Sequence, residues 1–508
     1  MGKSASLAFV TLLLGAQSVL GDPSEATNKA CTDLKNALPG KVLTPGFLQL
    51  EYEYETQQYW ATNLREVDPA CIVQPNSAQD VSDAVKILNK YPTVQFATRS
   101  GGHDPNKGHS TVQDGVVIAM TDLVGARYDA EEDVAYVKPG GEWNDVISEL
   151  EKSGVAIAGG RLGLVGVGGL LLGGGLSFLN AQEGLASDNI IGWETVMANG
   201  SIVNVDAKKH PDLAQAMRGS GGQFGIVTQF KAKVHHLGNV WGGSCVYDES
   251  KADQLYAVLH DFTAQGAQDP KAAIIFSDLV FAAGVKLKLV FYFYDNPTPP
   301  TSGPFADFIK VSSACKPTTQ KYSELLKKNG DPVGLLNARS FFRTYTIPHI
   351  PARPQMYKEI RDKLAELTTQ FLSIPPLIRA IQFSVDFQPF PALFGKISAT
   401  KGGNAMGLTA SDPDRIILIF QGAWNLSDDD DLAHGIARQL TSWLDEVVPK
   451  WIAEAGMPEN MYMPLFLNDA MWDQPVMQSY KDYNKFKTLQ KQVDPDGLWS
   501  TRAGGFKY

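Results

Sequence analysis

The sequence has no excess of positive charge and no apolar run long enough to cross a membrane. Its 45 lysines and arginines are outnumbered by 55 aspartates and glutamates, which gives a formal net charge of −10 at pH 7. Sequence-independent binding to nucleic acids relies on basic patches. The apolar run near the N-terminus spans about ten residues, whereas a helix that crosses a bilayer needs roughly 20. We therefore expect neither nucleic acid nor a membrane among the partners of this protein.

Cysteine is scarce, and several common catalytic motifs are missing. The chain has four cysteines among 508 residues, and none belongs to a CxxC pair, so the usual signatures of zinc and thioredoxin-type sites are absent. The motifs GxGxxG, GKS or GKT, GxSxG and HExxH do not occur either. We therefore predict no metal site, and a phosphate-bearing ligand would have to be held by a different glycine architecture.

The N-terminus has the three-part pattern of a secretory signal over residues 1–21. Lys3 supplies the positive start, residues 7–16 form the apolar segment, and residues 19–21 (VLG) offer small side chains for cleavage. The pattern predicts a secreted protein.

Secretion would have two consequences for the mature chain. In an oxidising compartment the cysteines can form disulfides, and the sequence alone leaves three connectivities open. These cysteines are Cys31, Cys71, Cys245 and Cys315. The acceptor sequons at Asn199 and Asn425 would become usable for N-glycosylation.

The length of the chain favours two domains, because one core rarely serves 508 residues. From residue 71 to about residue 235, short β-rich runs alternate with helical stretches and glycine-dependent turns. Between about 239 and 460, helical spacing at 355–372 and 430–448 separates strands with alternating patterns. We predict an α+β protein.

Two strands of the second region alternate strictly between two kinds of side chain. Lys286–Tyr294 carries Lys286, Lys288, Tyr292 and Tyr294 on one face and leucines and phenylalanines on the other. Residues 381–388 carry Gln382, Ser384, Asp386 and Gln388 opposite Ile381, Phe383, Val385 and Phe387. Such alternation predicts a sheet whose apolar face lies under helices and whose polar face meets something polar.

Two segments are rich in glycine. At residues 99–103 (RSGGH), consecutive glycines allow backbone N–H groups to converge on an anion. At residues 159–175, nine of seventeen residues are glycine, so the backbone can approach a ligand where any Cβ would clash. A loop or a tightly packed turn is the structural alternative.

Short motifs follow one another along nearly the whole mature chain. They are ACIVQP at 70–75, RSGGH at 99–103, VKPG at 137–140, GVGG at 166–169, LGGG at 172–175, GLASDN at 184–189, RGSGGQFGIVT at 218–228, GGN at 402–404 with Gly407, Asn484, DP at 494–495 and GGFK at 504–507. Each motif is weak alone. In this order and combination they resemble the berberine-bridge-enzyme-like branch of the vanillyl-alcohol-oxidase flavoproteins, in its fungal form.

The resemblance implies a two-part PCMH-type FAD-binding domain and a substrate domain, an antiparallel sheet covered by helices, that caps the flavin. One FAD would be attached covalently to His103, which ends the RSGGH motif, through the flavin's 8α carbon. Relatives carry a cysteine just before the IVQP match, which favours a Cys31–Cys71 disulfide. The other implied cofactor-binding residues are Arg99, Ser100, Gly101, Gly102, Gly108, Gly140, Gly166, Gly168, Gly169, Gly174, Gly175, Asp188, Asn189, Gly225, Ile226 and Val227.

The same resemblance implies the domain boundaries. They are a signal peptide at 1–21, an N-terminal segment at 22–66, the FAD-binding domain at 67–238, the substrate domain at 239–460, and a C-terminal segment at 461–508 that packs back on the FAD domain.

The chain departs from the family pattern at two positions. Many relatives tether the flavin a second time through a cysteine where this chain has Leu162, so we expect a single tether. That departure also weakens the case for a carbohydrate oxidase. Relatives use the tyrosine of an N-Y motif as catalytic base, where this chain has Asn468-Asp469. A carboxylate in an apolar pocket can accept a proton, although Asn-Asp can also be merely a turn.

The family architecture would aim the polar faces of the two alternating strands at the flavin. Asp386, Tyr292 and Tyr294 are therefore further catalytic candidates beside Asp469, and a solvent-exposed sheet face is the alternative. We expect an FAD-dependent oxidase or dehydrogenase that oxidises an alcohol or activated C–H of a small organic substrate, with dioxygen as a candidate acceptor. The alternatives are a redox-neutral isomerase or cyclase, a carbohydrate oxidase and a non-catalytic flavin-binding protein.

Overall fold

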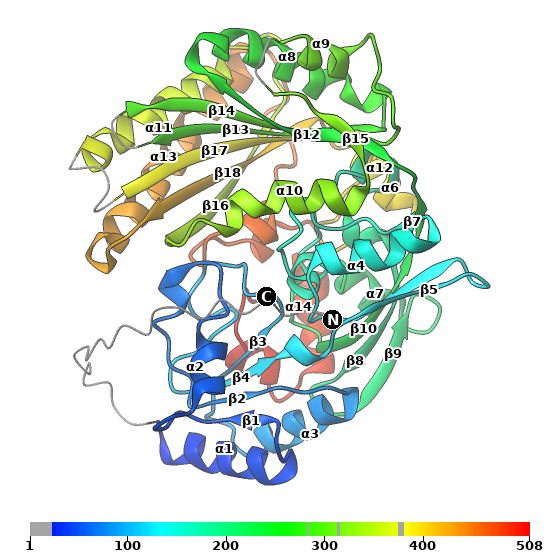
Figure 1. Ribbon diagram of the computed structural model, residues 1–508, viewed down its shortest axis with the longest axis vertical. Coiled ribbons are helices and arrows are strands. Elements are labelled where there is room, and N and C mark those ends of the chain that lie inside the picture. The colour runs from blue at the N-terminus through cyan, green and yellow to red at the C-terminus, as the bar shows by residue number, and fades with distance from the viewer. Residues whose placement is uncertain (1–22, 282–283, 312–314, 374–379) are drawn as a thin grey trace.

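The structure is a computed structural model that describes residues 23–281, 284–311, 315–373 and 380–508. The expected signal peptide lies outside these residues. Figure 1 shows a lower body built on two smaller sheets and an upper body built on one large sheet with helices across its outer face. Within the described residues, no helix is both long and apolar enough to span a bilayer.

The first sheet of the lower body has the strand order β1-β2-β4-β3. Strands β2, β3 and β4 run parallel, and β1 is antiparallel to β2. The elements of this part are α1 (Glu25–Ala37), β1 (Val42–Leu43), α2 (Leu50–Thr56), β2 (Cys71–Val73), α3 (Ala78–Leu88), β3 (Phe96–Arg99) and β4 (Val116–Ala119). Because β3 ends at Arg99, the RSGGH motif leaves the carboxyl end of a parallel strand, where ligand-binding loops commonly lie.

The second sheet is antiparallel, with the order β5-β6-β10-β8-β9. The elements of this part are β5 (Ala126–Asp129), β6 (Val134–Val137), α4 (Trp143–Leu150), β7 (Val155–Ala156), α5 (Val167–Leu172), α6 (Asn180–Glu183), β8 (Ile190–Val196), β9 (Ile202–Asp206), α7 (Pro211–Ala216), β10 (Ile226–Lys233) and β11 (His235–His236). The glycine-rich segment crosses the buried ring of Trp143. A Cβ on Gly159 would lie 2.1 Å from that ring, which explains the glycine there.

The upper body is a seven-stranded antiparallel sheet with the order β15-β12-β14-β13-β17-β18-β16. Its strands are β12 (Val240–Asp248), β13 (Ala272–Phe281), β14 (Lys286–Tyr294), β15 (Thr318–Gln320), β16 (Arg339–Pro348), β17 (Ala380–Phe390) and β18 (Arg415–Trp424). Its helices are α8 (Ala252–Gln265), α9 (Pro304–Lys310), α10 (Tyr322–Gly334), α11 (Met356–Ser373), α12 (Ala392–Thr400) and α13 (Asp430–Glu454). The expected α+β class, with an antiparallel sheet covered by helices, is confirmed. The exact domain boundaries stay predictions.

One face of the large sheet forms the core of the upper body. Buried side chains of β13, β14 and β17, such as Phe276, Val290 and Val385, pack with Leu255 of α8 and Ile360 of α11. In Figure 1 these helices, together with α13, lie on the far side of the sheet from the lower body. The opposite face is therefore left to meet the lower body.

Helix α13 is longer than its sequence suggests. Spacing predicts an end at residue 448, before Pro449, because proline removes a helical hydrogen bond. The helix instead continues through Pro449 to Glu454. Trp451 and Ile452, in the added turn, are buried in the same cluster as Val448, so tertiary packing outweighs the local cost of the proline.

The C-terminal segment returns to the lower body. In α14 (Tyr483–Val493), the amide of Gln490 donates to Gln223 Oε1 at 2.9 Å. The Arg502 guanidinium donates to the backbone oxygens of Val94 and Leu88 at 2.9 and 2.8 Å. These contacts hold the C-terminal segment against the lower body.

Two disulfides join distant parts of the chain. Cys31 of α1 is bonded to Cys71 of β2, as the resemblance implies, and Cys245 of β12 is bonded to Cys315. Only one of the three connectivities open to the sequence is therefore present.

The two faces of strand β14 are exchanged relative to the prediction: the face with Lys288 and Tyr292 lies under the helices. Lys288 is fully buried on the helix-covered face, where its Nζ lies 3.2 Å from Asp278 Oδ1 and also bonds Glu249. Tyr256 donates to the other oxygen of Asp278. The prediction that Lys288 lies on the polar face, away from the helices, is wrong. A charged side chain can be buried beneath the helices when it is fully paired.

Substitution of Lys288 by methionine should destabilise the protein. The change keeps the length of the side chain but leaves Asp278 buried without its cation, and breaking a buried pair from one side costs about 3–5 kcal/mol. The midpoint of denaturant unfolding should fall accordingly, whereas Lys286→Met, on the partly exposed start of the same strand, should shift it little. Equal shifts for the two variants would contradict this role.

Candidate functional site

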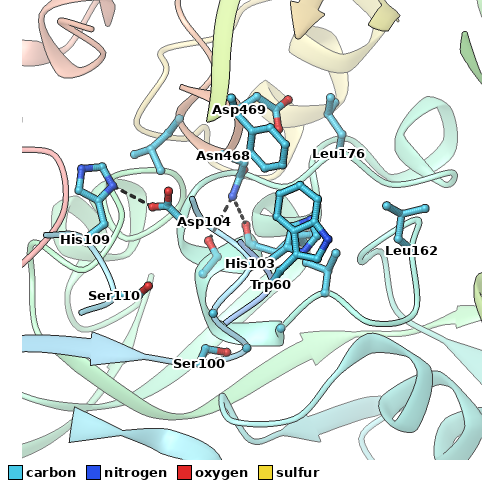
Figure 2. Close-up of a pocket in the computed structure, with 18 of the residues that line it drawn as sticks. Trp60, Ser100, His103, Asp104, His109, Ser110, Leu162, Leu176, Asn468 and Asp469 are labelled. Carbon is cyan, nitrogen blue, oxygen red and sulfur yellow. Dashed lines mark hydrogen bonds and ion pairs between the residues drawn. The ribbon is translucent and has the colours of Figure 1, made fainter. Parts of the chain in front are cut away.

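A cavity of about 610 Å³ lies between the large sheet and the lower body. The sheet contributes side chains of β13, β14, β17 and β18, and the lower body contributes the RSGGH motif and the glycine-rich segment. Residues 220–222, 225–227, 466–469 and 503–506 also line the cavity. Figure 2 shows His103 and Trp60 in the middle of this cavity, with Leu162 to one side and Asn468 and Asp469 above.

The two glycine-rich segments are in direct backbone contact. A Cβ on Gly101 would lie 2.6 Å from Gly166 Cα, so neither position can carry a side chain without displacement. Ser100 Oγ donates to Pro139 O at 2.6 Å and accepts from Gly168 N at 3.1 Å. A Cβ on Gly169 would meet nothing within 4 Å, so this backbone borders the open cavity. The segments form a cradle of bare backbone that a ligand can approach closely.

His103 projects from this cradle. It follows Gly102, which has a φ of +66°, and its ring packs 4.7 Å from the ring of Trp60 and 5.9 Å from that of Phe342. Its buried Nδ1 has no hydrogen-bond partner among the described residues. Burial lowers the pKa of the imidazole to about 4, against the opposing charge of Asp104. The ring is therefore neutral near pH 7 and carries an unused nitrogen.

Asn468 fixes the C-terminal segment to the cradle. Its Oδ1 accepts from Gly175 N at 3.0 Å, and its Nδ2 donates to Gly169 O at 3.2 Å. A Cβ on Gly173 would lie 2.3 Å from Asn468 Nδ2, which explains why this position of the glycine-rich segment is glycine. These bonds leave the next side chain, Asp469, in the cavity (Figure 2).

Asp469 belongs to a row of three polar groups. Gln388 Nε2 donates to Asp469 Oδ2 at 3.3 Å, and Gln388 Oε1 accepts from the Arg161 guanidinium. Burial raises the pKa of the Asp469 carboxyl to about 7, although the charge of Arg161 and the hydrogen bond from Gln388 oppose the rise. A carboxyl with this pKa can both accept and release a proton near neutrality.

Asp386 is a second carboxyl on the same wall. It lines the cavity from β17 beside Gln382 and Ser384. Burial raises its pKa to about 6, and Arg161 acts against the rise. Phe383 and Val385 lie in the helix-covered core, so the prediction for the two faces of this strand is confirmed.

The tyrosines of β14 do not line the cavity. Tyr292 is buried in the helix-covered core, where its hydroxyl lies 2.7 Å from that of Tyr247. Tyr294 packs on the same side against Phe305. The cavity wall is formed by the leucines and Phe291 of this strand. The prediction that its polar face meets the site is wrong, because hydroxyl and ammonium groups on this strand are paired beneath the helices and its apolar residues line the cavity.

The expected cofactor residues divide into two groups. Those that line the cavity are Ser100, Gly101, Gly102, His103, Gly166, Gly168, Gly169, Gly225, Ile226 and Val227. The others do not line it, and they are Arg99, Gly108, Gly140, Gly174, Gly175, Asp188 and Asn189.

Three of the residues outside the cavity have clear structural contacts instead. Arg99 points away from the cavity and pairs with Glu55. Asp188 accepts hydrogen bonds from Leu185 N at 2.8 Å and from the Asn404 side chain at 2.9 Å. A Cβ on Gly140 would lie 1.7 Å from the carbonyl oxygen of Met120. Some motif residues therefore line the cavity, whereas others hold the surrounding backbone in place.

Several residues that line the cavity have no clear signal in the sequence. They are Trp60, Asp104, His109, Phe342 and Gln421. Gln388, which joins Arg161 to Asp469, has no sequence signal beyond its place in an alternating strand. Arg161, which the sequence analysis does not single out, also lines the cavity and does have a usable signal, since it is a charged residue inside the glycine-rich run.

Comparisons with known proteins agree with this geometry. Residues 69–206 match the FAD binding domain family. An uncharacterized FAD-linked oxidoreductase from Arthroderma benhamiae is 33% identical over 465 residues, which cover 90% of this chain and 91% of that protein. The FAD-dependent monooxygenase drtC of Aspergillus calidoustus is 30% identical over 529 residues, which cover 99% and 97%.

The fold is also that of solved flavoproteins. The structure of berberine bridge enzyme from Eschscholzia californica superposes with a TM-score of 0.72 at 16% identity, covering 94% of this chain and 99% of that one. Together these findings establish the family. The chain belongs to the FAD-linked oxidoreductases, and it shares the fold of berberine bridge enzyme, with a PCMH-type FAD-binding domain and an antiparallel-sheet substrate domain.

Proposed function

We propose that this protein is a secreted oxidase or dehydrogenase that removes a hydride from an alcohol or activated C–H of a small organic substrate. The observation that carries the proposal is the single cavity in which the glycine cradle, the unused nitrogen of His103 and the carboxyl of Asp469 meet. The cradle serves the cofactor, and the sheet face serves the substrate. Exposed sequons at Asn199 and Asn425 and the two disulfides fit secretion.

The residues of the cradle fit FAD. Bare backbone at Gly169 and Gly222 borders open space, where N–H groups can meet a pyrophosphate. His103 Nδ1, which is buried and has no hydrogen-bond partner in the described part of the chain, suits a covalent bond. Leu162 on the cavity wall offers no second attachment. When bound, FAD supplies the acceptor for the hydride.

Asp469 is the proposed base. It lies where it can reach a substrate on the sheet side, and its pKa near 7 leaves much of it ionised at neutral pH. Gln388 fixes one carboxyl oxygen by its 3.3 Å hydrogen bond. The carboxylate accepts the hydroxyl proton of the substrate while the hydride leaves the adjacent carbon. Asp386 is the alternative base, since it lines the same wall.

The substrate side of the cavity favours a largely apolar molecule. Ile275, Leu279, Leu287, Leu289 and Phe291 make the part of the sheet wall formed by β13 and β14 mostly apolar. The polar side chains of the wall lie mainly on β17 and β18, and they are Ser277, Gln382, Ser384, Asp386 and Gln421. A sugar would leave its hydroxyls unpaired against such surfaces. We infer a secondary metabolite rather than a carbohydrate, with dioxygen as acceptor. Because the similar protein drtC is named a monooxygenase, a product with an oxygen atom from labelled O₂ would separate that outcome from peroxide release.

Acid precipitation tests the tether. The wild-type protein should keep its yellow colour in the precipitate, because FAD is bonded to His103. His103→Ala should release all flavin to the supernatant while still binding FAD reversibly through the cradle. His109→Ala, which changes the other histidine of the cavity wall, should keep the tether. Complete release of flavin from wild-type protein would refute covalent attachment.

The role of Asp469 is testable by Asp469→Asn with an alcohol found in a screen under air. The change is nearly isosteric and removes only the proton-accepting ability, so flavin reduction in stopped-flow absorbance should slow about 10²–10⁴-fold. Wild-type reduction should slow as the pH falls below about 7, because the base becomes protonated, and the variant should lack this limb.

Asp386→Asn is the matched comparison. If Asp469 is the base, the flavin-reduction rate of Asp386→Asn should still fall as the pH drops below about 7. A rate for Asp469→Asn within about threefold of wild type, far below the general-base range, would transfer the role to Asp386. Normal product without flavin bleaching in either protein would favour a redox-neutral isomerase or cyclase.

A further inference from the structure

Arg161 is the one lysine or arginine among the described residues that lines the large cavity. Its backbone is held firmly, because Gly160 packs on the ring of Trp143 and Gly163 N donates to Leu326 O at 2.9 Å. Arg161 also borders a second, smaller cavity of about 50 Å³. The guanidinium therefore stands at a fixed place with open space on two sides.

The guanidinium is only partly used by the protein. Arginine has five N–H donors, and within the described part of the chain Arg161 forms one hydrogen bond, to Gln388 Oε1, and no ion pair. Burial lowers its pKa below the usual value, although the charges of Asp469 and Asp386 oppose this. The side chain is half-buried in the cavity wall, so its unused donors are open to an anion that enters from outside the chain.

We infer that the substrate carries a carboxylate and that Arg161 binds it. This inference rests on the proposed function and narrows its substrate class to small organic acids with an apolar skeleton. The planar fork of arginine matches a carboxylate with parallel hydrogen bonds. Leu289 and Phe291 of the cavity wall suit the apolar skeleton. Asp469, which the Gln388 side chain links to Arg161, then faces the position to be oxidised.

The charge around Arg161 depends on pH. The titratable groups that act on it are Asp469, Asp386 of β17 and Tyr322 of α10. Burial raises the pKa of Tyr322 well above its usual value, so it stays neutral. Burial raises the pKa of the carboxyls to about 7 and about 6. At pH 5.5 both are therefore largely protonated, and at pH 8 both are ionised and compete with a bound anion.

Calorimetric titration of the FAD-loaded protein with benzoate and with benzamide tests the inference. The two probes have nearly the same size, and only benzoate is charged, because its carboxyl has an ordinary pKa of about 4. Wild-type protein should prefer benzoate at pH 5.5, and this preference should shrink several-fold at pH 8. Benzamide affinity should not depend on pH.

Variants at position 161 separate charge from shape. Arg161→Gln should weaken benzoate about 10- to 100-fold, the usual contribution of charged hydrogen bonds, and change benzamide little. Arg161→Lys should keep part of the preference. Asp469→Asn should strengthen benzoate at pH 8, because it removes the competing charge.

Three results would overturn the inference. They are no binding of benzoate by wild-type protein, equal affinity for benzoate and benzamide, and a loss in Arg161→Gln that is the same for both probes. The comparison of the two probes on wild-type protein stands even if a variant does not fold. Because titration measures binding without turnover, failure here leaves the base assignment of Asp469 untouched, and failure of that assignment leaves this one untouched.

Discussion

The contact between the backbones of Gly101 and Gly166 is the constraint on which the site depends. The chain brings two segments far apart in sequence so close that a single methyl group on either would lie 2.6 Å or less from the other. Ser100 then locks them with bonds to Pro139 and Gly168. His103 leaves one side of this junction, and helix α5, with the bare backbone of Gly168 and Gly169, leaves the other. Moving either segment would separate His103 from the cradle.

The site also depends on the large sheet, which shields two carboxyl groups from bulk water. Asp386 sits among buried neighbours on β17, and Asp469 lies over the same wall. Desolvation disfavours the charged form of each, and Arg161 limits the rise by its charge. The cavity thus holds acids whose pKa values are set near neutrality mainly by burial, while the charge of Arg161 lowers both and the charge of Asp386 adds to the rise at Asp469.

Sequence patterns predicted the α+β class, the covering helices and the polar face of β17, because each is encoded in local periodicity. The same reasoning failed for β14. Alternation identifies two faces but not which one is inside, and here Lys288 is buried because Asp278 and Glu249, distant in sequence, neutralise it. The glycine motifs located the cradle, yet Arg99 and Asp188 support it from behind, a distinction that only packing reveals.

The partners of Asp469 show why the rest of the site could not be predicted. Gln388 and Arg161 come from different domains, and no spacing in the sequence connects them. A further link is Asn106, three residues after His103. Its amide donates to Asp104 Oδ1 at 2.7 Å and to Ala470 O at 2.9 Å, and its oxygen accepts from Trp472 N at 2.9 Å.

Asn106 is almost completely buried, so its amide cannot exchange these bonds for water without a large cost. The loop that presents His103 is consequently fastened to the loop that presents Asp469. The proposed attachment point of the cofactor, His103, and the proposed base, Asp469, lie on loops that are joined by one side chain, and this link does not pass through the large sheet. A substrate bound between them would meet both groups in a geometry set before it arrives, and such preorganisation is what positions a base for proton transfer.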